Sequence, residues 1–172
     1  TAAWSGVEIA PVMKDAVEHA ARACESFGHQ VSETMPPLDN EAFMDATHVY
    51  WIANLYHWIA ETEKVVGRRA GPDTLEATTR ACYEAGQRVT AYELLSALST
   101  GNQITRRLAE FFVDYDVLVT PTIASPALAI GAINANDASV TAREWTEAQF
   151  AFAPFTPQWN MTGQPAISLP LH

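Results

Sequence analysis

Apolar residues recur at helical spacing along much of this 172-residue chain. A first amphipathic run begins at Pro11, because the N–H that proline lacks would be unpaired in the first turn of a helix anyway, and it should end at Gly28. A second run, capped by Asp39 or Asn40, is expected to continue to about Val66. Its apolar side consists of Phe43, Val49, Ile52, Leu55, Tyr56, Ile59 and Val66. The pattern therefore predicts two long helices in the first 66 residues.

Three short motifs mark further helix starts, each an oxygen-bearing side chain followed three positions later by glutamate. They begin at Asp73, Thr90 and Thr141. Such a pair satisfies N–H groups that the first turn of a helix leaves free. We therefore predict three more helices, of which the second ends near Val113 and the third near Ala153. Residues 123–141 are rich in Ala, Pro, Asn and Ser and predict an irregular loop.

Three short stretches predict β-strands, namely residues 30–34, 117–120 and 166–169. The apolar run 117–120 follows a helix directly and is typical of a central strand that is buried on both faces. Together the elements predict an α/β fold class, a helix-rich fragment with about three short strands of a larger mixed sheet. Three strands separated by long helical segments cannot complete a sheet. The pattern therefore also predicts an open sheet edge, whose neighbouring strands lie elsewhere in a parent chain.

The composition indicates one globular domain, since 48% of the residues are hydrophobic and 17% are charged. Twenty acidic and ten basic residues give a formal net charge of -10, which disfavours binding to nucleic acid or to an anionic membrane surface. No run of about 18 apolar residues predicts a membrane span. Cys24 and Cys82 lie in amphipathic runs that suit reduced core thiols better than a disulfide, which favours a cytoplasmic location.

Two stretches near the end of the chain carry the most specific pattern. Asp116-Val-Leu-Val-Thr-Pro-Thr122 is followed, after the long loop, by Phe155-Thr-Pro-Gln-Trp-Asn-Met-Thr-Gly-Gln-Pro-Ala-Ile-Ser-Leu-Pro170. In the second stretch Asn160 tolerates left-handed geometry, Gly163 permits a positive φ and Pro165 restricts entry into the next segment. By themselves these residues predict a sharp turn rather than a catalyst.

The order of these segments resembles the C-terminal part of the amidase signature family, whose members hydrolyse carboxamides with a Ser-Ser-Lys triad. Residues 9–37 and 111–171 carry the resemblance. It implies that the whole chain, residues 1–172, is the C-terminal part of an amidase domain, with a variable helical region at about 39–113 and a conserved-type region at about 114–172. In the variable region, Gly67-Arg68 after the aromatic helix resembles hydrolases of cyclic and linear aminohexanoate oligomers.

The resemblance also implies that catalysis occurs outside this chain. In the family, the lysine and the glycine- and serine-rich nucleophile region lie upstream, and nothing in residues 1–172 matches them. The expected partners are therefore the upstream half of the same amidase and a small-molecule amide, with no catalytic residue in this chain and no metal or organic cofactor. Taken alone, the chain is expected to be inactive.

Six residues are candidates for the wall of the substrate pocket: Trp51, Thr120, Thr122, Phe155, Trp159 and Asn160. Each is explained equally well as core or turn. His57 and Glu61 lie one helical turn apart and could share a metal, but a helix salt pair or a solvated face explains them better. The alternative function is a free-standing helical interaction or binding module without catalysis. In either case the open sheet edge predicts self-association.

Overall fold

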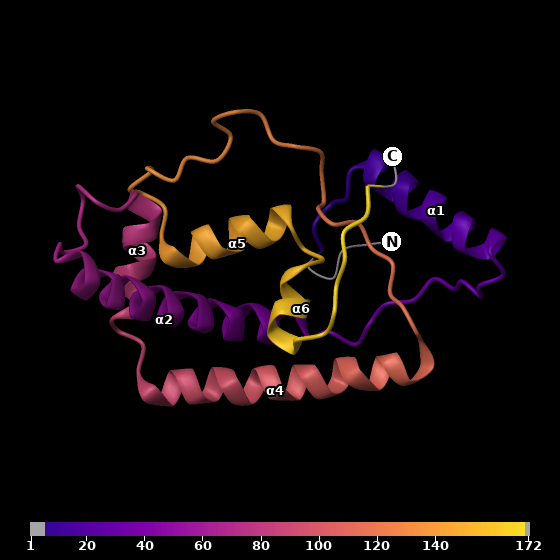
Figure 1. The fold of residues 1–172 in the computed structure, drawn as a ribbon, viewed down its shortest axis with the longest axis horizontal. Coiled ribbons are helices and arrows are strands. Elements are labelled where there is room, and N and C mark those ends of the chain that lie inside the picture. The colour runs from indigo at the N-terminus through magenta and orange to yellow at the C-terminus, as the bar shows by residue number, and fades with distance from the viewer. Residues whose placement is uncertain (1–5, 171–172) are drawn as a thin grey trace. The chain divides into compact units, whose positions relative to one another are not determined.

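The computed structural model describes residues 6–170, which contain six helices (Figure 1). The helices are α1 (Pro11–Ser26), α2 (Asn40–Val66), α3 (Ala77–Gly86), α4 (Ala91–Asp114), α5 (Ala142–Phe152) and α6 (Pro157–Thr162). Among these residues, no helix combines the length and the apolar character needed to cross a membrane. The chain divides into two compact units: the first comprises residues 6–40, 102–128 and 150–170, and the second comprises residues 41–101 and 129–149.

The predicted bounds of the first two helices are confirmed. Proline occupies the first turn of α1, and Gly28 adopts a φ of 91°, a left-handed conformation that a helix cannot continue. The second helix, α2, ends at Val66 before Gly67, which also has a positive φ. The expected apolar side of α2 is only partly buried: Phe43 and Ile52 lie in the core, whereas Val66 is exposed.

Two of the three capping motifs are confirmed. At the start of α4 the backbone N–H of Glu93 donates to the Thr90 hydroxyl (3.2 Å), and the Thr90 N–H donates to the Glu93 carboxylate (2.7 Å). Thr141 and Glu144 make the same reciprocal pair before α5. These bonds satisfy N–H groups of the first helical turn.

The prediction that a helix starts at the Asp73 motif is wrong. The next helix, α3, begins at Ala77, and its N-cap residue Glu76 makes no side-chain capping bond. The Thr74 hydroxyl instead accepts from the Gly71 N–H (2.8 Å), so this motif stabilises the preceding turn.

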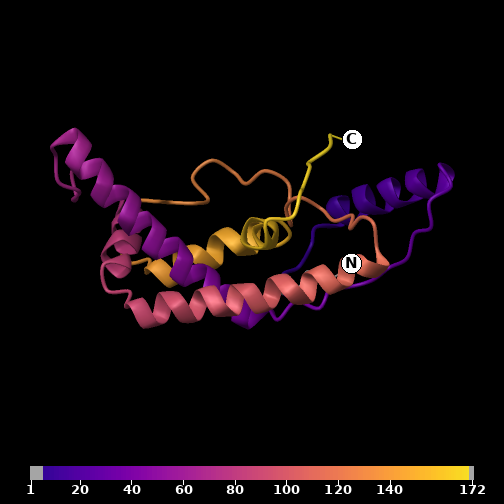
Figure 2. The same cartoon turned by 60° about the horizontal axis from the view of Figure 1, so that its bottom comes forward.

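The predicted α/β fold class is also wrong, because no strand occurs anywhere in residues 6–170 (Figure 2). An extended segment becomes a strand only when its backbone N–H and C=O groups pair with a neighbouring segment. Within the described part of the chain, no backbone–backbone hydrogen bond joins residues 117–120 or 166–169 to another segment. Val117 and Val119 are exposed, which contradicts the expected burial on both faces, and residues 30–34 are likewise irregular.

The core of the second unit forms where α2, α3 and α5 meet (Figure 1). Ile52, Cys82 and Ala142, one residue from each helix, are buried together. Gly86 at the end of α3 lies directly against the backbone of α2 at Ile52. Both cysteines are free thiols, as the sequence predicted.

In the first unit, backbone hydrogen bonds tie together segments that are distant in the sequence. The Ala10 N–H donates to the Ala124 carbonyl (2.8 Å), and the Ala124 N–H donates to the Phe152 carbonyl (2.9 Å). Ala124 is buried at this junction. It therefore links the segment before α1, the segment after residue 122 and the end of α5.

At the far end of the long loop, in the second unit, the Ala135 carbonyl accepts from both the N–H and the hydroxyl of Thr78, each at 3.0 Å.

Candidate functional site

Five of the six candidate pocket residues belong to the first unit, and Trp51 belongs to the second. The five are Thr120, Thr122, Phe155, Trp159 and Asn160. They lie on the extended segment after α4 and on the segment that leads into and forms α6. We describe this part of the first unit as the candidate site.

The conserved-type turn is built differently from the expectation. Asn160 lies inside the short helix α6 and is exposed, so it does not adopt the left-handed geometry that the sequence suggested. Gly163 adopts the left-handed conformation instead, with a φ of 71°, and its N–H donates to the Trp159 carbonyl (2.9 Å) at the end of the helix. The sharp change of direction therefore depends on Gly163, and α6 presents the Asn160 side chain to solvent.

The Trp159 side chain packs against the end of α4. Its ring meets that of Phe112 edge to face, with centroids 6.0 Å apart. Phe112 in turn meets Phe111 edge to face at 5.2 Å. Trp159 is half-buried, so part of the indole is held in an aromatic cluster and part remains available for contact.

Phe155 is a core residue. Only 2% of its surface is exposed, and it is buried together with Ile9 while Val7 and Met13 pack around the pair. This burial agrees with the core interpretation of Phe155, and its place in the pocket wall stays a prediction. Its role is to fix the segment that precedes α6 onto the segment that precedes α1.

The hydroxyls of Thr122 and Ser168 lie 3.1 Å apart, which joins two segments 46 residues apart in sequence. Both residues are exposed, and Thr120 nearby is half-buried. A serine or threonine becomes a nucleophile when an adjacent base removes its proton. A second hydroxyl acts as such a base only when a further group, such as a lysine, takes its proton, and within residues 6–170 no hydrogen bond joins either hydroxyl to a base. This pair is therefore suited to positioning and hydrogen bonding rather than to covalent catalysis.

The segment around α6 also carries buried polar atoms that sequence reasoning missed. The Gln158 amide donates to the Pro154 carbonyl (2.8 Å), which orients its side chain. Within residues 6–170 the Oε1 atoms of Gln158 and Gln164 and the Thr162 hydroxyl are buried without a hydrogen-bond partner. Unpaired buried polar groups cost about 1–3 kcal/mol each. Three such atoms thus lie within seven residues, and no sequence pattern signals this grouping.

Sequence analysis also missed a network of polar side chains around His48 in the second unit. The Thr146 hydroxyl donates its single proton to the Ala142 carbonyl (2.9 Å), so His48 must donate to it through Nδ1–H (3.0 Å). Arg143 bridges Asp45 and Glu147, each at 2.6 Å. Burial, followed by the charge of Arg143, lowers the pKa of His48. The partners lie almost 100 residues apart, so local spacing gives no signal of this network.

The described residues form no metal site, and the buried Cys82 thiol is not reactive. Across residues 6–170 no group of three or more His, Cys, Asp or Glu side chains is placed to hold a metal ion. Glu61 forms an ion pair with Lys64, which agrees with a helix salt pair. Burial raises the pKa of the Cys82 thiol to about 11, so it stays protonated at neutral pH.

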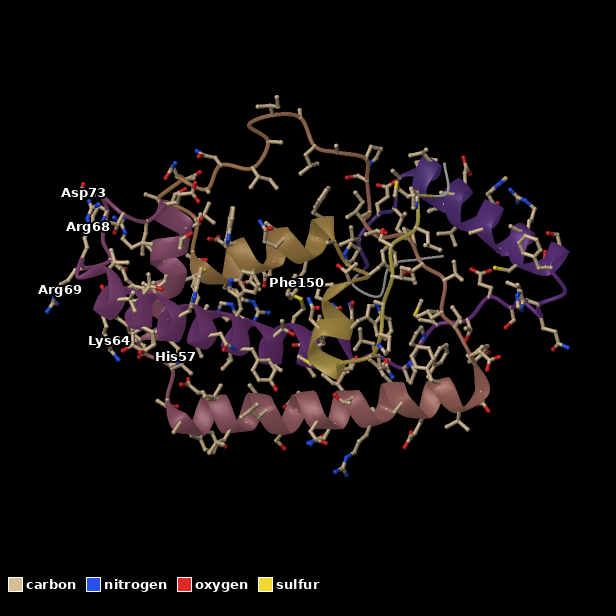
Figure 3. All side chains as sticks on the ribbon, in the orientation of Figure 1. His57, Lys64, Arg68, Arg69, Asp73 and Phe150 are labelled. Atoms are coloured by element: carbon tan, nitrogen blue, oxygen red, sulfur yellow. The ribbon has the colours of Figure 1, made fainter. Side chains whose placement is uncertain are left out.

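The connection between α2 and α3 carries charges of both signs. Figure 3 shows Lys64, Arg68, Arg69 and Asp73 around this connection. Arg68 donates to the Asp73 carbonyl at 3.5 Å, and Glu63 accepts from the Ala70 N–H. Because acidic side chains lie on either side of these basic ones in the sequence, the surface is that of an ordinary solvated turn rather than an anion site.

Comparison with known proteins identifies relatives of this chain. The protein named "Putative amidase AmiC" from Mycobacterium leprae is 31% identical over 168 residues, which are 95% of this chain and 34% of that protein. A lipoamidase from Enterococcus faecalis is 25% identical over 187 residues, which cover 98% of this chain and 25% of the relative. The chain thus spans about a third or less of the length of these relatives.

The fold is shared with a solved hydrolase. The structure of 6-aminohexanoate cyclic dimer hydrolase superimposes with a TM-score of 0.84 at 23% identity, covering 94% of this chain and 35% of that one. The amidase family model matches residues 3–172. The chain therefore belongs to the amidase family.

Proposed function

We propose that this chain is the C-terminal part of an amidase that hydrolyses carboxamide C–N bonds, and that it supplies scaffold and pocket wall. The observation that carries the proposal is the match of the amidase model to residues 3–172 of a chain that spans about a third of its relatives. This match favours an amidase over a free-standing interaction module. The free cysteines are compatible with a cytoplasmic location.

The catalytic residues of this proposal lie upstream. There a lysine relays a proton through one serine to activate the nucleophilic serine, and backbone N–H groups hold the oxyanion of the tetrahedral intermediate. The amine then leaves, and water hydrolyses the acyl-enzyme. The Thr122 and Ser168 hydroxyls are consistent with catalytic residues that lie upstream, since they bond to each other rather than to a base.

Within this chain, the proposed contribution to the pocket is orientation of the amide. Asn160 and Thr122 are exposed and can each donate or accept a hydrogen bond, and Trp159 offers a half-buried aromatic edge. Trp51 stays a candidate on the second unit. Phe155 supports this wall from the core rather than contacting the substrate.

The substrate class is a linear or cyclic amide. A panel of one primary amide, one linear aminohexanoate oligomer and the cyclic aminohexanoate dimer tests it, using the polypeptide extended by the residues that its gene encodes before Thr1. We expect release of amine or free acid by the extended polypeptide and none by the 172-residue chain. Turnover by the short chain at a similar rate would overturn the upstream location of the nucleophile.

The exposed apolar surface of the short chain also leads us to propose that it self-associates when separated from its upstream part. Ile167 and Val117, which no segment of residues 6–170 covers, are examples. Sedimentation over a range of concentrations tests this, and a monomer at high concentration would contradict it.

A further inference from the structure

An apolar stripe runs along one side of α2. Trp51, Trp58 and Val65 are 47%, 69% and 87% exposed, and they follow one another at intervals of seven residues. On an α-helix, residues seven apart lie within about 20° of the same direction. We call these three residues the α2 stripe. It extends about 21 Å along the helix at 1.5 Å per residue.

The α2 stripe is separate from the side of α2 that packs in the core. Ile52 and Ile59 are buried, and Ile52 belongs to the cluster with Cys82 and Ala142. Each of them follows a stripe tryptophan by one residue, a rotation of about 100° around the helix axis. The helix thus has two apolar sides, of which only one is covered within the described residues.

Polar side chains beside the α2 stripe make hydrogen bonds or an ion pair within their own helix. Asn54 donates to the Tyr50 carbonyl (3.0 Å), and Thr62 donates to the Trp58 carbonyl (2.8 Å). Glu61 is paired with Lys64. Each of these side chains thus makes one interaction within the helix, which lowers the polar cost of placing protein beside the stripe. The Glu61–Lys64 pair is itself exposed and can stay at the edge of such a contact.

We propose that the α2 stripe is the surface on which the rest of the amidase polypeptide, outside these 172 residues, packs against the second unit. This inference rests on the proposed function. The relatives are about three times as long as this chain, so most of such an enzyme is available as the occupant. A stripe of about 21 Å exceeds what one small amide can cover, whereas it matches the length of a helix or a layer of apolar side chains.

A second copy of this chain fits the stripe less well. Each copy carries a net charge of -10, so pairing brings together two strongly acidic bodies. Packing two tryptophans and a valine against another part of the same enzyme does not pair two copies of this acidic chain. Aromatic side chains of this size dominate the energy of protein contacts.

The test compares Val65→Asp with Val66→Asp in the gene-encoded extended polypeptide and in the 172-residue chain. The two valines are the last two residues of α2 and both are exposed, but Val66 lies about 100° away from the stripe. We expect Val65→Asp to lower the thermal unfolding midpoint of the extended polypeptide by roughly 2 °C or more relative to Val66→Asp, because a charge is buried without a partner. In the 172-residue chain both variants should unfold alike.

A second readout is labelling of Trp58 by hydroxyl radicals, which should be strong in the 172-residue chain and weak in the extended polypeptide. Equal labelling in both, or equal midpoints for the two valine variants, would overturn the inference. If Val65→Asp abolishes self-association of the short chain while Trp58 stays labelled in the extended polypeptide, the occupant is a second copy and the inference is likewise wrong. Amide hydrolysis by the unmutated extended polypeptide is measured in parallel, so failure of the proposed function is recognised separately.

Discussion

Gly86 lies so close to Ile52 that a β-carbon built on the glycine would be 2.1 Å from the Ile52 carbonyl oxygen. The Tyr56 β-carbon would be only 2.7 Å away. Backbone cannot move aside as the end of a flexible side chain can, so α3 approaches α2 here only because residue 86 has no side chain.

Replacing Gly86 by alanine should therefore separate α2 from α3. We expect Gly86→Ala to lower the free energy of unfolding by about 1–3 kcal/mol, the usual cost of overpacking. Urea titration followed by circular dichroism measures it. Gly71→Ala is the matched control, because a β-carbon there meets nothing within 4 Å. Equal stability of the two variants would show that the helices do not pack this closely.

His48 should make the stability of the chain depend on pH. Its pKa is lowered in the folded state, first by burial and then by Arg143, whereas Glu147 and Asp45 oppose the shift. The folded state therefore binds fewer protons than the unfolded state, and the stabilisation present above the unfolded pKa of about 6.5 is lost as the pH falls below it. Urea titrations at several values between pH 8 and pH 5 should show this decline.

The matched control for His48 is His57, an exposed histidine on the same helix. We expect His48→Gln to flatten the decline in the free energy of unfolding below pH 6.5 and His57→Gln to leave it unchanged. If both variants lose stability with the same pH profile as the unmutated chain, His48 is not the group responsible.

The two cysteines should differ in reactivity. Cys82 has no exposed surface and a pKa of about 11, whereas Cys24 is partly exposed. Because the thiolate is the reactive form, iodoacetamide at neutral pH should modify Cys24 in the folded chain and Cys82 only after unfolding. Mass spectrometry of the alkylated peptides measures both sites. Early modification of Cys82 would mean that the core around Ile52 and Ala142 opens readily.

Substitutions of Phe155 and Asn160 should distinguish a residue that stabilises the fold from one that contacts the substrate. We expect Phe155→Ala to cost about 3–5 kcal/mol of stability, as for other buried phenylalanines. Asn160→Ala removes an exposed side chain, and should change the KM of the extended enzyme for amides while its unfolding free energy stays within about 0.5 kcal/mol. A stability loss for Asn160→Ala, with KM unchanged, would place Asn160 among the supporting residues instead.

Helices were predictable from this sequence because their signals are local. Proline at position 11, the reciprocal pairs at Thr90 and Thr141, and the glycine after α1 act within one helical turn, and each was confirmed. The motif at Asp73 failed because Thr74 bonds within the preceding turn. Local chemistry therefore identified the helices well, except where a turn competed for the same side chain.

Local signals of this kind could not predict the strands or the candidate site. Whether Val117 lies in a strand depends on a partner segment, and the chain's own described residues provide none. The motif left Phe155 open between pocket wall and core, and its burial depends on Ile9, almost 150 positions away. The hydrogen bond between His48 and Thr146 likewise depends on tertiary packing between segments distant in the sequence. Alternation and motif order cannot encode contacts of this range.

The anchoring of the long loop between Ala124 and Ala135 has a practical consequence. Each end is held by backbone hydrogen bonds within its own unit, at Ala10 and Phe152 on one side and at Thr78 on the other. Between these anchors Ile130 is fully exposed. The loop tip is thus a suitable place to insert a reporter peptide or to create new termini by circular permutation, since neither operation removes an anchoring bond.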